Sequence, residues 1–132
     1  MTMKIETQLA VFLDNRPGML ARTCQALAKA GINILAMSIL DTVDHAIVRM
    51  IVNRPRDAET VLSHMHTLVQ AREVIVMDVP NQPGSLAKIA EHLTEAGINL
   101  EYAYGTCATD QDRALFVLRT SDLEATISAL AD

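Results

Sequence analysis

The residues with the clearest capacity for chemistry lie in two turns of almost the same sequence. Residues 15–21 are Asn-Arg-Pro-Gly-Met-Leu-Ala, and residues 81–87 are Asn-Gln-Pro-Gly-Ser-Leu-Ala. A second motif, Ala-Gly-Ile-Asn, occupies 30–33 and returns at 96–99. An asparagine side chain offers an acceptor and two donors, and the helix N-terminus expected after each turn favours anions. The combination predicts recognition of the carboxylate, ammonium and polar groups of an amino acid.

The candidate ligand-binding residues are the polar residues and glycines of these motifs. They are Asn15, Arg16, Gly18 and Asn33 in the first copy, and Asn81, Gln82, Gly84, Ser85 and Asn99 in the second. We expect the turn and the second motif of each copy to lie at the same end of a sheet. The alternative is structural, because Asn before Pro-Gly often bonds turn backbone, and Gly-Ile-Asn can be a helix stop followed by a strand.

Both motifs recur at a spacing of 66 residues, without insertion or deletion between them. Between residues 9–34 and 75–100, ten of 26 aligned positions are identical. The 132 residues are therefore two copies of one small unit, which we place at 1–71 and 72–132.

Each copy carries the pattern β-α-β-β-α-β. Period-two runs of branched residues predict strands, and apolar stripes at helical spacing predict helices. The expected strands are 5–13, 33–40, 46–52, 67–71, 73–79, 98–104 and 114–119. The expected helices run from Pro17 to about Ala30, from Pro55, over 84–96, and from Ser121, which forms a capping box with Glu124. This order predicts an α+β fold of two tandem ferredoxin-like units, each an antiparallel sheet with helices on one face.

The second unit is expected to lack its last strand. The counterpart of 67–71 would be 133–137, which lies beyond the sequence. We therefore expect an open sheet edge that a partner chain covers.

Over essentially its whole length, the chain resembles the ACT domain, a small regulatory module that binds amino acids. The resemblance is most specific at 14–34 and 80–100. It implies a βαββαβ fold, effector binding without catalysis, and a ligand held at an interface between two modules. In serine-regulated relatives a histidine flanks the Pro-Gly turn. This sequence has Leu13 and Val79 there, which leaves the identity of the ligand open.

Other classes of function are disfavoured. A net charge of −5 and 3% aromatic residues do not suit a nucleic-acid binder. No apolar run is long enough to cross a membrane, and two cysteines without a pairing pattern favour the cytoplasm. We expect no cofactor and no metal site, since His64-x-His66 has no obvious third ligand. No catalytic motif is present, so we expect no enzymatic activity.

These observations predict a non-catalytic regulatory protein that senses a small amino acid and acts on a metabolic enzyme or a transcription factor. The alternative is an interaction or oligomerisation module without a small ligand. Apolar residues on both sides of 33–40 and 46–52 predict self-association, most simply as a homodimer.

Overall fold

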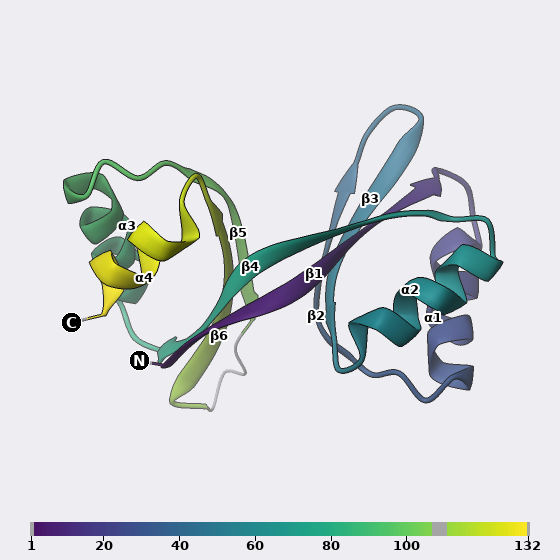
Figure 1. The fold of residues 1–132 in the computed structure, drawn as a ribbon, viewed down its shortest axis with the longest axis horizontal. Coiled ribbons are helices and arrows are strands. Elements are labelled where there is room, and N and C mark those ends of the chain that lie inside the picture. Colours follow the sequence, from purple (N-terminus) through teal and green to yellow (C-terminus); the bar gives the residue numbers. More distant parts are fainter. Residues whose placement is uncertain (1, 107–110, 132) are drawn as a thin grey trace. The chain divides into compact units, whose positions relative to one another are not determined.

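The computed structural model describes residues 2–106 and 111–131 and contains two compact units. The N-unit is Thr7–Arg72, and the C-unit is Met1–Glu6 together with Glu73–Asp132. Figure 1 shows both helices of each unit on one face of its strands. The fold class is that predicted, two ferredoxin-like units with antiparallel sheets.

The N-unit has the strand order β2-β3-β1-β4. Its elements are β1 (Thr2–Asp14), α1 (Met19–Lys29), β2 (Ile34–Asp41), β3 (His45–Val52), α2 (Pro55–His64) and β4 (Leu68–Pro80). Alternate residues Leu9, Val11 and Leu13 of β1 are buried in the same core as Leu27 of α1 and Leu62 of α2. The period-two pattern of β1 therefore fixes which face of the sheet carries the helices.

The C-unit has the same order, β5-β6-β4-β1. Its further elements are α3 (Ser85–Glu95), β5 (Leu100–Thr106), β6 (Arg113–Thr120) and α4 (Leu123–Leu130). Ile75, Met77 and Val79 of β4 are buried with Ile89 and Leu93 of α3.

The expectation of an open edge in the second unit is wrong. The start of β1 belongs to the C-unit, and β1 is the neighbour of β4. The second copy contributes three strands of its own, and the first residues of the chain occupy the fourth position. The first strand is therefore divided between the two units rather than belonging wholly to the first copy, as the repeat had predicted.

Strand β4 also differs from the prediction. The two strands expected at 67–71 and 73–79 are one continuous strand of 13 residues. Its first part belongs to the N-unit and the rest to the C-unit. The predicted boundary between residues 71 and 72 therefore falls inside a strand, and the first six residues group with the C-unit rather than with the first copy.

The cap of the last helix lies one residue later than expected, and α4 begins at Leu123. The residue that caps α4 is Asp122, whose Oδ1 accepts a hydrogen bond from the Ala125 amide at 3.0 Å. The predicted capping box of Ser121 and Glu124 is therefore wrong.

Within the described residues, no helix is long and apolar enough to cross a membrane. Cys24 is a free, half-buried thiol, and Cys107 lies outside the described residues.

Candidate ligand-binding site

The two Asn-x-Pro-Gly turns connect the first strand of each repeat to its first helix. Gly18 and Gly84 are the residues before α1 and α3, with φ angles of 88° and 90°. A Cβ built on either glycine would meet nothing within 4 Å. The glycines are therefore required by the backbone conformation of the turn and not by a neighbour that packs against them.

Asn15 connects its turn to the hairpin between β2 and β3. Its Nδ2 donates hydrogen bonds to Asp41 Oδ1 at 2.7 Å and to the Thr42 carbonyl at 3.3 Å. The hydrogen bonds of this side chain therefore hold a turn to a neighbouring loop.

Asn81 does the same in the C-unit. Its Nδ2 donates to the Gln111 carbonyl at 2.9 Å, and its backbone amide donates to the Asp112 carbonyl at 2.7 Å. The repetition of this asparagine therefore has a structural explanation, which is the bracing of the turn against the loop before β6.

Asn33 and Asn99 do not converge with the turns, contrary to expectation. In the N-unit, β1 and β2 both pair antiparallel with β3, so they run parallel to each other. The end of β1 and the start of β2 therefore lie at opposite ends of the sheet. The Asn33 amide donates to Asn53 Oδ1 at 2.9 Å, whereas Asn15 contacts the far end of β2.

The same separation holds in the C-unit. Strands β4 and β5 both pair antiparallel with β6. The Asn99 carbonyl accepts a hydrogen bond from the Ser121 amide at 3.1 Å, at the other end of the sheet from Asn81. The crossover helix between the first two strands of each repeat makes this separation unavoidable.

The other predicted turn residues have partners within their own turns. Ser85 Oγ donates to the Pro80 carbonyl at 2.6 Å, so its proton is already committed. Arg16 lies 3.9 Å from the carboxylate of Asp14, with both side chains largely exposed. The backbone N–H of Gln82 donates to the Pro80 carbonyl at 3.1 Å.

The first turns of α1 and α3 are open to an anion. Among the described residues, no side chain caps either helix, and neither has an acidic residue in its first turn. Helix α2 has Asp57 in that position, and α4 has its Asp122 cap and Glu124. The partial positive charge of the helix N-terminus is therefore least compensated at the two repeated turns.

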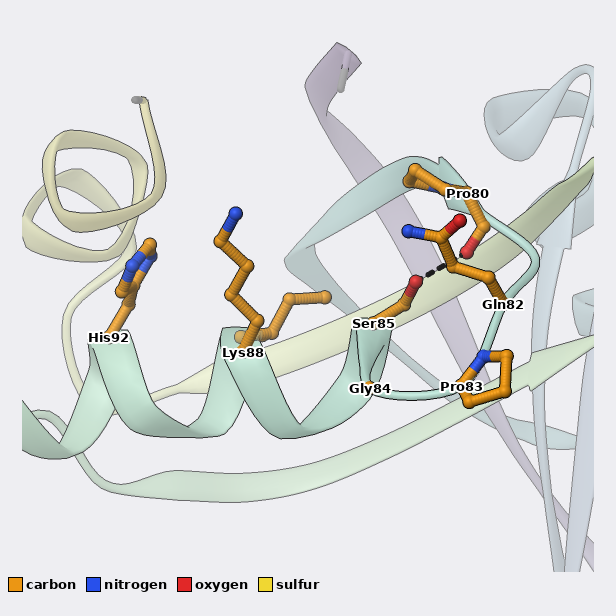
Figure 2. A pocket seen from close by; sticks show the side chains of 8 residues that line it. Pro80, Gln82, Pro83, Gly84, Ser85, Lys88 and His92 are labelled. Carbon is orange, nitrogen blue, oxygen red and sulfur yellow. Dashed lines mark hydrogen bonds between the residues drawn. The ribbon is translucent and has the colours of Figure 1, made fainter.

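A surface pocket of about 390 Å³ lies at the turn of the C-unit. It is lined by Pro80, Gln82, Pro83, Gly84, Ser85, Lys88, Ile89 and His92. Figure 2 shows Lys88 and His92 rising from the same side of α3. The pocket therefore extends from the start of the helix along the side that carries Lys88 and His92.

A smaller pocket of about 230 Å³ lies at the turn of the N-unit. It is lined by Phe12, Leu13, Asp14, Arg16, Met19, Arg22, Thr23, Met65, His66 and Thr67. Two guanidinium groups and one carboxylate thus border one cavity, a charge pattern complementary to a zwitterion.

Comparison with known proteins agrees with this architecture. The sequence matches the family described as ACT domain pair over residues 1–130. This chain belongs to that family. It is similar to a protein from Bacteroides thetaiotaomicron whose crystal structure has a TM-score of 0.91 at 33% identity, covering 98% of this chain and 88% of that one. The resemblance to the ACT domain inferred from the two motifs is thereby confirmed.

More distant structures share the fold of the ACT domain pair. The regulatory subunit of aspartate kinase from Thermus thermophilus, in a ligand-free form, superposes with a TM-score of 0.70 at 18% identity. The alignment covers 99% of this chain and 96% of that one. No curated protein matches the sequence.

Several pocket residues of this ACT domain pair were not among the predicted site residues. Arg22 and Lys88 each line a pocket, and they lie 66 residues apart at corresponding positions of the two repeats. A basic residue four positions after each turn glycine was the available signal. His66 and His92 come from parts of the repeats that do not correspond, so the duplication gave no indication of them.

The histidines of the ACT domain pair do not form a metal site in the part of the chain that is described. No group of three or more His, Cys, Asp or Glu side chains is placed to hold a metal ion there. His64 is the last residue of α2, and His66 follows in a left-handed conformation with φ 56°.

Proposed function

We propose that this ACT domain pair binds a small amino acid as a regulatory ligand and acts on a partner protein. The observation that carries the proposal is the N-unit pocket, which Asp14, Arg16 and Arg22 line together. An amino acid presents a carboxylate and an ammonium, which two guanidinium groups and a carboxylate complement. The uncapped start of α1 adds further attraction for the carboxylate.

The role of each residue follows from its position. Arg16 and Arg22 hold the carboxylate, Asp14 holds the ammonium, and Gly18 sets the direction of the helix start. Asn15 keeps the turn in place through Asp41. In the C-unit, Asn81, Gly84 and Ser85 shape the corresponding turn, and Gln82 borders its pocket.

We propose that the regulated activity resides on another protein. The ACT domain pair accounts for residues 1–130. We propose a metabolic enzyme or a transcription factor as the partner, without catalysis by this chain. The ligand would then favour one conformation of the pair over another, by as much as its affinities for the two differ.

A thermal-shift screen of the twenty amino acids tests the proposal. A ligand present at a hundredfold its dissociation constant should stabilise the protein by about 2.7 kcal/mol. Arg22→Gln should abolish the shift, whereas Lys88→Gln, the matched change in the C-unit, should leave it intact. The proposal fails if no amino acid shifts the unfolding temperature at millimolar concentration.

A second function, protein interaction without a ligand, is supported by strand β2. Leu35, Met37 and Ile39 are 51%, 40% and 49% exposed on this edge strand. Apolar side chains on an open edge favour pairing with another chain, most simply a second copy. Light scattering at micromolar concentration distinguishes a homodimer from a monomer of 14.4 kDa.

A further inference from the structure

The pockets at the two turns differ in charge, although the turns themselves are repeated. Of the described residues that line the C-unit pocket, Lys88 is cationic and none is Asp or Glu. The N-unit pocket has Asp14 among its lining residues. An amino acid that entered the C-unit pocket would find no carboxylate for its ammonium.

The C-unit pocket has one buried nitrogen without a hydrogen bond and one exposed cation without an ion pair in the described residues. His92 Nδ1 is buried and has no hydrogen-bond partner among the described residues. Lys88 is exposed and forms no ion pair with any residue that the structure describes. A buried nitrogen without a partner costs free energy, which a ligand oxygen would recover.

The pocket also has two places where an anionic group is favoured. One is the start of α3, which follows Gly84 and has no side-chain cap. The other lies between Lys88 and His92, on the same face of the helix (Figure 2). With a rise of 1.5 Å per residue, Lys88 lies about 4.5 Å along the axis from Ser85, and His92 about 6 Å further.

We propose that the C-unit pocket binds a small dicarboxylate, with one carboxylate at the start of α3 and the other between Lys88 and His92. The cavity of about 390 Å³ lies within the range of small-molecule sites, ~300–1,000 Å³. The proposal gives the regulatory function a second class of ligand. It does not require that an amino acid binds in the N-unit.

Isothermal titration of the full chain with sodium glutarate tests this assignment. Butyrate supplies one carboxylate of similar length, glutamate adds an ammonium, and inorganic phosphate represents any small anion. Glutarate should bind at least tenfold more tightly than butyrate or phosphate, and more tightly than glutamate. Equal affinity for phosphate and glutarate would overturn the proposal. So would the absence of any binding heat when glutarate reaches millimolar concentration at a 10-fold molar excess over the protein.

Variants place the ligand in the pocket. Lys88→Gln should weaken glutarate binding at least tenfold, and His92→Phe should weaken it while keeping a ring of similar size. Arg22→Gln changes the corresponding position of the N-unit and should leave glutarate affinity unchanged. An equal loss in Lys88→Gln and Arg22→Gln would refute the site.

The outcome is separable from that of the amino-acid screen. Glutarate binding that depends on Lys88, without any amino-acid shift, would support this inference and reject the amino-acid function. An amino-acid shift that depends on Arg22, without glutarate binding, would do the reverse.

Discussion

Replacement of Gly84 by alanine tests whether the turn glycines serve backbone conformation alone. The residue has φ 90° and ψ −9°, and a Cβ placed there meets no atom within 4 Å. The left-handed conformation costs a residue with a Cβ about 1–2 kcal/mol. The lower entropy of the unfolded alanine chain returns about 0.4–1 kcal/mol. The expected loss of unfolding free energy is therefore about 1 kcal/mol.

Urea unfolding followed by circular dichroism measures this loss, and Gly84→Asn is the matched control. Asparagine tolerates left-handed backbone better than alanine, so its cost should be clearly smaller. A loss near 1 kcal/mol lowers the midpoint temperature by about 4 °C in a chain of this size. Equal stability of Gly84→Ala and the unmodified protein would refute the reasoning. So would a loss above about 3 kcal/mol, which would require a steric clash.

Three further changes separate other roles. Asp122→Ala should lower the unfolding free energy by about 1 kcal/mol through loss of the helix cap, whereas Ser121→Ala should have no measurable effect in the same denaturation assay. Asn15→Ala should cost about 1 kcal/mol and speed hydrogen exchange in the hairpin that it braces; unchanged exchange would contradict that role. Gly105→Ala should destabilise the protein by more than Gly84→Ala, because its Cβ collides with the Phe116 ring; the added change Phe116→Leu should restore part of the loss, and no rescue in thermal melts would exclude the clash.

The fold could be predicted from the sequence because several signals agreed for each element. The first helix of each repeat was expected to end at about Ala30 and at residue 96. Gly31 and Gly97 follow these ends, with left-handed φ angles of 73° and 69°. Alternation in β1 and helical spacing in α1 placed Leu9 and Leu27 in one core. Local conformational preference and burial pattern indicated the same structure at these positions, and a helix or strand can be predicted from sequence when the two agree.

The candidate site was predicted less well, because recurrence does not distinguish a ligand contact from a structural one. Asn15 and Asn81 recur in turns that must each be tied to a neighbouring loop. Asn33 was grouped with Asn15 although a crossover connection places the two at opposite ends of β2. The positions that differ between the repeats, such as Asp14 and Pro80, give the two pockets their different charges instead.

The 66-residue period also explains why the edge prediction failed. A repeat of this length holds three strands and two helices, and its fourth strand must come from the start of the next repeat. Strand β4 satisfies this for the N-unit, because its first part closes that sheet before the rest opens the C-unit. In the C-unit, the start of β1 takes the corresponding position. Both units therefore depend on a strand that they share with the other.

Removal of residues 2–6 should then destabilise the core around Met77 and Leu118, which are distant in sequence from these residues, more than the core around Leu27. Hydrogen exchange resolved by residue would show this order, and equal protection losses in the two cores would contradict it.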